Sequence, residues 1–135
     1  MANLLAASRA EVHHGCLVVR RSDSTGDLSG WDPRNASFYN GGDSLIFGVA
    51  PAVDGPINLE VWDAIPPNSR SGPFFSEIVE GGIGDIIIED PNGDINMVIP
   101  WSRSEFVLEA YVDDARSPRE IQVVIDPLSP PFRVS

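Results

Sequence analysis

The chain has 135 residues and a net charge of −11 at pH 7, because twenty carboxylates outnumber nine basic residues, all of them arginine. A duplex-binding surface needs a clustered excess of Lys and Arg, so this composition argues against direct nucleic-acid binding. No apolar run approaches the ~20 residues of a membrane span, and we expect no membrane association. The length predicts a single domain that can bury a core.

The first residues and the cysteine content predict a cytoplasmic protein. The opening segment Met1–Arg9 has no basic region and no apolar run long enough for a signal peptide. Cys16 is the only cysteine of the sequence, so no disulfide can form within the chain. Both features are typical of a reducing compartment. We expect Cys16 to be a buried, unreactive thiol.

Both ends of the chain are expected to lie outside the core. Residues 1–10 contain Leu4–Ala7, which favours a helix but is short, so we predict a loose arm or a short helix. Residues 127–135 are rich in proline, and we predict a tail that cannot continue a sheet. The β core is expected within residues 11–126.

Short runs of alternating apolar and polar residues between these ends predict about eight strands. The runs lie within Glu11–Arg21, Asp43–Ala50, Ile57–Asp63, Phe74–Glu80, the two arms of Gly81–Pro100, Ser104–Asp114 and Arg119–Asp126. Residues 22–42 are expected to form a long polar loop held by its aromatic residues. Many short strands separated by turns are typical of an all-β, single-domain antiparallel β-sandwich.

The stretch Gly81–Pro100 predicts a hairpin. Its Asp-Pro-Asn-Gly turn, which begins at Asp90, has the chemistry of a type I turn closed by a glycine bulge. That register places Asp90 opposite Asp94 and Ile87 opposite Met97. Because both faces of the hairpin are then apolar, we expect it in the interior of a sheet, with Ile87 buried.

Two groups of residues contain side chains that can bind metals, but the spacing of neither group predicts a metal site. On a strand, His14 and Cys16 would share one face while His13 points away, and no second pair of ligands follows downstream. The turn around Asp90 lacks the ligand pattern of a calcium loop. A weak cation between the facing Asp90 and Asp94 stays an open alternative, because like charges opposite each other cost stability.

The sequence does not predict an enzyme or a bound cofactor. It has no Gly-x-Ser-x-Gly motif, and its two histidines are adjacent, so neither is placed as a separate base. Its glycine-rich run Gly81–Gly84 is not followed by a helix that could bind phosphate. An enzyme acting through carboxylates would need a deep cleft with a strongly shifted carboxyl pKa.

Four segments form a pattern: the run Phe75–Ile86, the pair Ile99-Pro100, the strand Phe106–Val112, and a histidine-bearing strand followed by a polar segment, His14–Asp23. In this pattern the chain resembles the competence protein J family. The resemblance implies a small intracellular bacterial β protein that inhibits a DNA-entry nuclease.

Charge and resemblance together predict a protein-binding module, an inhibitor or immunity-type partner of a basic protein such as a nuclease. A carboxylate-rich face speeds association with a basic cleft, and large aromatic residues anchor interfaces. The residues that we predict to bind the partner are the carboxylates Glu89, Asp90, Asp94, Asp113 and Asp114 and the anchors Trp62 and Trp101. The alternative is a ligand-binding or scaffold sandwich in which the acidic residues only confer solubility.

Overall fold

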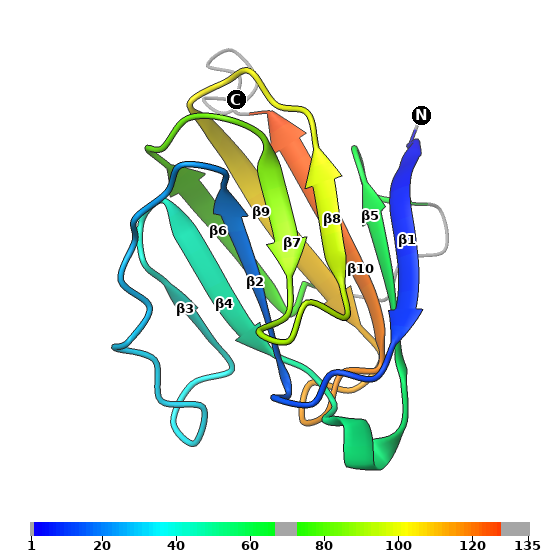
Figure 1. The fold of residues 1–135 in the computed structure, drawn as a ribbon. Coiled ribbons are helices and arrows are strands. Elements are labelled where there is room, and N and C mark those ends of the chain that lie inside the picture. Colours follow the sequence, from blue (N-terminus) through cyan, green and yellow to red (C-terminus); the bar gives the residue numbers. More distant parts are fainter. Residues whose placement is uncertain (1, 67–72, 128–135) are drawn as a thin grey trace.

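The protein is a sandwich of two five-stranded sheets (Figure 1). The computed structural model describes residues 2–66 and 73–127. Ten strands are present in these ranges: β1 Leu4–Ala10, β2 Cys16–Arg21, β3 Phe38–Asn40, β4 Ser44–Gly48, β5 Ile57–Trp62, β6 Phe75–Glu80, β7 Ile86–Glu89, β8 Asn96–Ile99, β9 Glu105–Val112 and β10 Glu120–Pro127. A short 3-10 turn, η1 Ala52–Asp54, precedes β5.

The strand order is β1-β5-β10-β9-β6 in one sheet and β3-β4-β2-β7-β8 in the other. The pairing of β5 with β10 is parallel, and the other pairs are antiparallel. The prediction of an all-β sandwich is therefore confirmed. No helix in the described part of the chain is long and apolar enough to cross a membrane.

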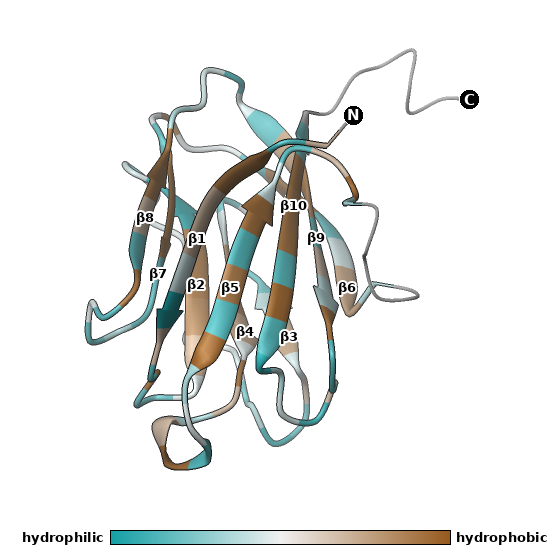
Figure 2. Cartoon of the chain, turned by 90° about the vertical axis from the view of Figure 1, so that its right-hand side faces the viewer, coloured by the Kyte–Doolittle hydropathy of each residue, from teal (hydrophilic) through white to brown (hydrophobic). Residues whose placement is uncertain are grey.

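The core lies between the sheets and follows from the two-residue period of a strand. The inward side chains of β5 and β10 alternate along each strand, and all six are at most 1% exposed: Ile57, Leu59, Val61, Ile121, Val123 and Ile125. Figure 2 shows the corresponding alternation of apolar and polar bands along both strands.

The prediction of a loose arm or short helix for residues 1–10 is wrong, because Leu4–Ala10 form the strand β1. This strand pairs antiparallel with β5 at the edge of its sheet, and Ala6 and Ala10 pack against the core. The backbone N–H and the side-chain amide of Asn3 donate to the Asp63 carboxylate at 2.7 and 2.9 Å. Pairing with the free edge of β5 therefore outweighs the local helix preference. The predicted tail lies outside the described residues except for Pro127, which ends β10.

The first predicted strand, Glu11–Arg21, is interrupted by a turn. The Gly15 N–H donates to the Val12 carbonyl at 3.2 Å, and Gly15 has a φ of 65°, which glycine adopts without strain. β2 begins only after this turn, so His13 and His14 lie in it and not on opposite faces of a strand. The predicted loop 22–42 also contains β3, which pairs with β4. These differences give ten strands where about eight were predicted.

The hairpin of β7 and β8 is confirmed, but its predicted register is wrong by one residue. Ile88 pairs with Met97, and the turn between Asp90 and Ile95 is one residue longer than predicted. The reason is the Asp90 carboxylate, which accepts the Ile95 N–H at 2.6 Å and leaves Asp94 outside the pairing. The two aspartates therefore do not face each other.

The new register also changes which side chains are buried. Ile86 and Ile88 are 0% exposed on the core side, whereas Ile87 is only half-buried and Val98 is 58% exposed. The predicted burial of Ile87 and the interior position of the hairpin are both wrong, because β8 is an edge strand. At the edge of the sheet, the outer face of the hairpin can stay exposed to solvent.

Candidate functional site

The predicted partner-binding residues do not form one surface. Three of them belong to the β7–β8 hairpin, and Asp113 and Asp114 belong to the β9–β10 loop, which lies at the same, lower end of the sandwich in Figure 1. Trp62 ends β5 and Trp101 follows β8, and both of these strands end at the upper end. The predicted anchors are therefore separated from the predicted carboxylates by the length of the strands.

The hairpin carboxylates are engaged within the protein. Asp90 is 2% exposed, and its carboxylate accepts the backbone N–H groups of Asn92 and Ile95 at 3.2 and 2.6 Å. It belongs to the turn and is not a rim residue. Glu89 forms an ion pair with Arg20, with 2.6 Å between Oε2 and Nε.

The histidines of the β1–β2 turn contact the tip of this hairpin. His13 Nδ1 lies 3.4 Å from Asp94 Oδ2, and His14 Nε2 lies 2.9 Å from Asn92 Oδ1. Within residues 2–66 and 73–127, no group of three or more His, Cys, Asp or Glu side chains is placed to hold a metal ion. The weak cation considered between Asp90 and Asp94 has no facing pair of carboxylates to bind it.

The two carboxylates of the β9–β10 loop accept backbone hydrogen bonds. Asp113 accepts the N–H groups of Arg119 and Glu120 at 3.0 and 3.1 Å, and Asp114 accepts that of Arg116 at 2.9 Å. Burial raises the pKa of Asp113, but the backbone donors together lower it more, so this pKa lies below its ordinary value. Both side chains stabilise the loop.

The two predicted anchors are less available than the sequence indicates. Trp62 is half-buried on the outer face of its sheet, where its indole N–H donates to Glu60 at 3.0 Å. Trp101 packs edge-on against Phe106 with ring centroids 5.7 Å apart, and its buried Nε1 has no partner among the described residues. Trp101 therefore covers the end of the core.

Cys16 is buried, as predicted. Burial raises the pKa of its thiol, and the nearby charge of Asp90 raises it further. A buried thiol kept protonated is a poor nucleophile.

A different segment combines an exposed apolar side chain with a backbone that is hydrogen-bonded to its neighbours. We call it the acidic loop, residues 80–85, which joins β6 to β7 and begins and ends with a carboxylate. Its centre is Ile83, whose side chain is 73% exposed. Gly82 and Gly84 have φ angles of 72° and 99°, which favour glycine, and a Cβ on Gly84 would also collide with the Ser22 side chain.

Buried and polar neighbours fix the acidic loop. Arg21 is 2% exposed, and it donates from Nε to the Gly84 carbonyl at 2.8 Å and from Nη1 to the Ser104 carbonyl at 3.3 Å. The Asp23 carboxylate accepts the Ile83 N–H, and the Asp23 N–H donates to the Ile83 carbonyl at 3.3 Å. These bonds connect the loop to β2 and to the β8–β9 loop, so Ile83 is presented on a fixed backbone.

Carboxylates lie at both ends of the acidic loop and on its neighbours. Glu80 pairs directly across the sheet with Glu105, an arrangement in which like charges oppose each other. Asp43 lies beside Gly81, and Asp85 completes the loop. The sequence prediction missed this site, although a single isoleucine between glycines and carboxylates is the signal that marks it.

No protein-family model matches the chain, and no curated protein matches it in sequence. Among solved structures, ComJ from Bacillus subtilis, the inhibitor of the DNA-degrading activity of NucA, shares the fold with a TM-score of 0.69 at 10% identity, over 95% of this chain and 99% of its own. The protein described as Crocagin biosynthetic gene J matches with a TM-score of 0.53 at 8% identity, over 96% and 99%. At these identities the likeness establishes the fold, and the resemblance to the competence protein J family is confirmed at that level.

Proposed function

We propose that this protein binds and restrains a basic protein partner, a nuclease, and that the acidic loop makes the central contact. The observation that carries the proposal is Ile83, a 73% exposed apolar side chain on a backbone fixed by its neighbours. Interface hot spots combine an apolar anchor with a polar rim, and a rigid anchor loses little entropy on binding. The chain acts by binding and not by catalysis.

The charges around the loop suit a partner that binds nucleic acid. A nuclease lines its cleft with positive charge to hold phosphates, and carboxylates steer association with such a cleft. Glu80 and Glu105 repel each other in the free protein. A cation from the partner placed between them would remove this repulsion, and that gain exists only in the complex.

The fold comparison supports the same class of function. ComJ is described as the inhibitor of a DNA-degrading activity, and its fold covers 95% of this chain. We carry the inhibitor role to this protein as part of the proposal, together with the cytoplasmic location expected from the sequence. The predicted set around Asp94 and Asp114 is the rival surface for the same partner.

The test is inhibition of DNA degradation in an extract of the source organism, followed by isolation of the inhibited enzyme as a complex. Two variants with the same loss of charge separate the two surfaces. Glu80→Gln with Asp85→Asn changes the acidic loop, and Asp94→Asn with Asp114→Asn changes the rival surface. We expect the first variant to associate more slowly, with a weaker salt dependence, and the second to behave as wild type.

Two results would contradict the proposal. If the wild-type protein leaves DNA degradation unchanged at every salt concentration, the inhibitor function is wrong. If inhibition is lost only in the Asp94 and Asp114 variant, the function stands and the contact surface moves to the lower end.

A further inference from the structure

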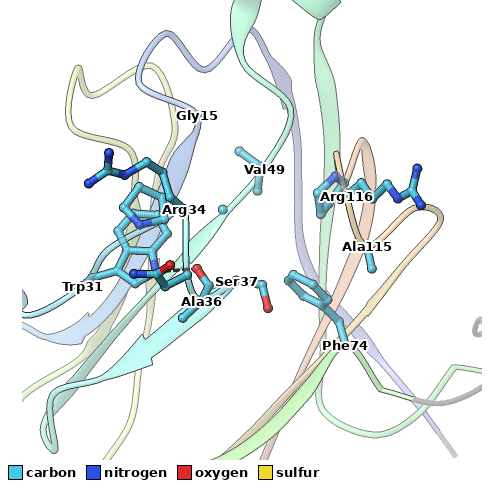
Figure 3. Close-up of a pocket in the computed structure, with 13 residues that line it drawn as sticks. Gly15, Trp31, Arg34, Ala36, Ser37, Val49, Phe74, Ala115 and Arg116 are labelled. Carbon is cyan, nitrogen blue, oxygen red and sulfur yellow. Dashed lines mark hydrogen bonds between the residues drawn. The ribbon is translucent and has the colours of Figure 1, made fainter.

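A groove of about 500 Å³ opens at the lower end of the sandwich, where the two sheets meet (Figure 3). We call it the arginine groove. One wall comes from residues 31–37 of the β2–β3 connection, and the other from Phe74 and residues 115–118 of the β9–β10 loop. The volume lies within the roughly 300–1,000 Å³ of typical binding pockets.

The first wall is held by its own hydrogen bonds. The Trp31 indole N–H donates to the Ala36 carbonyl at 3.0 Å, which fixes the ring. The Asp32 carbonyl accepts the backbone N–H groups of Asn35 and Ala36, each at 3.0 Å. This wall therefore exists before any ligand arrives.

The floor and the second wall are equally ordered. Gly48 lies in β4, and a Cβ on it would lie 3.9 Å from Trp31 Cζ2, so the missing side chain leaves the groove open. On the other side, the Pro118 carbonyl accepts the Ala50 N–H at 2.8 Å, and the Phe74 ring lies 5.9 Å from that of Phe75. The groove thus has an aromatic ring on each wall.

The charge of the groove is opposite to that of the chain. Its described lining includes Arg34 and Arg116 and no carboxylate, although the net charge of the protein is −11. Asp32, in the same segment, pairs with Arg34 at 3.3 Å between Oδ1 and Nε, so an incoming carboxylate would meet the other N–H groups of this guanidinium. In Figure 3 the two guanidinium groups extend away from each other on opposite sides of the groove. They cannot close on one small anion, but they can meet two carboxylates that flank an apolar group seated between the rings.

The acidic loop has this complementary chemistry. Glu80 and Asp85 flank Ile83 in sequence, and Ile83 is 73% exposed at the opposite end of the strands. We propose that the acidic loop of a second copy of this chain occupies the arginine groove. Ile83 enters between Trp31 and Phe74, and the flanking carboxylates pair with the arginines.

The geometry of this contact predicts the form of the assembly. The loop and the groove lie at opposite ends of one molecule, so the interface joins two different surfaces head to tail. Each added copy leaves one free loop and one free groove. The contact is small and the copies repel each other through their net charge, so association is weak and concentration-dependent. Assembly also covers the acidic loop, although this inference does not rest on the proposed function.

The test is sedimentation of the purified chain over a range of concentrations, without any partner. We expect the average mass of the wild type to rise with concentration. Ile83→Ala, which removes the inserted side chain, and Arg34→Ala with Arg116→Ala, which removes the rim charges, should each remain monomeric. Arg9→Ala is the control for loss of positive charge, because it removes an exposed arginine of β1, outside both the groove and the acidic loop, and should assemble like the wild type.

Mixing the two defective variants gives the sharpest result. Ile83→Ala keeps an intact groove, and the Arg34 and Arg116 variant keeps an intact loop, so the mixture should form dimers and nothing larger. Gly48→Leu fills the groove without changing charge. A mixture of Gly48→Leu with Ile83→Ala should therefore also form dimers and nothing larger. A wild type that stays monomeric, as it would if an acidic segment of another protein filled the groove, overturns the proposal. Assembly that survives all three variants also overturns it.

Discussion

The acidic loop and the arginine groove lie at opposite ends of one sandwich, and they differ in the side chains that support them. The loop depends on a buried cation, because Arg21 donates to two carbonyls beneath it. The groove depends on aspartates, because Asp32 and Asp114 accept backbone N–H groups in its two walls. The loop nevertheless presents carboxylates at the surface, whereas the lining of the groove presents arginines.

This difference explains why net charge is a poor guide to binding surfaces in this chain. Many of the twenty carboxylates serve turns, and Asp90 is the extreme case at 2% exposed. A carboxylate that is buried in a turn by its bonds to two backbone N–H groups is not accessible to a partner. The carboxylates of the acidic loop matter because they flank an exposed apolar side chain in the sequence, not because they are numerous.

The largest expected effect comes from a test of the hairpin register, in which Asp90 lies inside the turn between β7 and β8. Ile88 is 0% exposed, so Ile88→Ala should lower the free energy of unfolding by about 2–5 kcal/mol. Ile87 is half-buried on the other face, and Ile87→Ala should cost about 1 kcal/mol or less. Urea unfolding of both variants measures the difference. Equal losses, or a larger loss for Ile87, would restore the register in which Asp90 faces Asp94.

Sequence patterns predict this fold well wherever one face of a strand is polar. The alternation in β5 identifies its inward residues, because a slip of one residue would expose all of them. The β7 run of three isoleucines has no such alternation, so its register depends on the turn. The turn depends on a hydrogen bond from Ile95 to the Asp90 side chain, which composition does not reveal.

The candidate site was harder to predict because its parts come from distant segments. Arg21 contacts the carbonyls of Gly84 and Ser104, which are 63 and 83 residues away in the chain. β1 was missed for a related reason, since its partner β5 lies about fifty residues later. Local propensity contains no information about either contact. Exposed Ile83 could have been suggested by its glycine neighbours, but its rigidity could not.

The second prediction concerns Arg21, whose hydrogen bonds support the acidic loop. Arg21→Leu removes both charged hydrogen bonds and leaves the Gly84 carbonyl without this donor, so the free energy of unfolding should fall by about 3 kcal/mol. Arg34→Leu is the matched change in the groove. Its side chain is 89% exposed, so it should change stability by less than about 0.5 kcal/mol. Similar losses in the two variants would mean that Arg21 is not buried as described.

The third prediction concerns partner binding. If Ile83 is the anchor, Ile83→Ala should weaken the complex by about 2 kcal/mol, mainly through faster dissociation. Val53→Ala is the control, because Val53 is 89% exposed in η1 at the lower end. Surface plasmon resonance with the isolated partner separates the two rates. Equal dissociation rates for wild type and Ile83→Ala would remove Ile83 from the interface.

A smaller effect is expected from the opposed pair of glutamates. Glu80→Gln removes the repulsion with Glu105 and should stabilise the free protein by about 0.5 kcal/mol at low salt. The gain should shrink as salt screens the charges. Glu11→Gln changes an exposed glutamate outside the acidic loop and serves as the control. A gain that does not depend on salt would have a cause other than charge repulsion.

The smallest effect is the pH dependence of the β9–β10 loop, which contributes Ala115, Arg116 and Pro118 to the arginine groove. Burial raises the pKa of Asp113, but its backbone donors lower it more, so the folded value lies below the unperturbed 3.8. A lowered folded pKa means that the stabilisation is complete above the unfolded pKa and is lost as pH falls through the folded pKa. Wild type should therefore lose stability relative to Asp113→Asn as pH is lowered through this acid range, and the difference should be constant near neutral pH. The change is small because Asp113 is exposed. Thermal unfolding of both proteins from neutral to acid pH measures it, and parallel curves throughout would show that the backbone bonds of Asp113 do not favour its charged form.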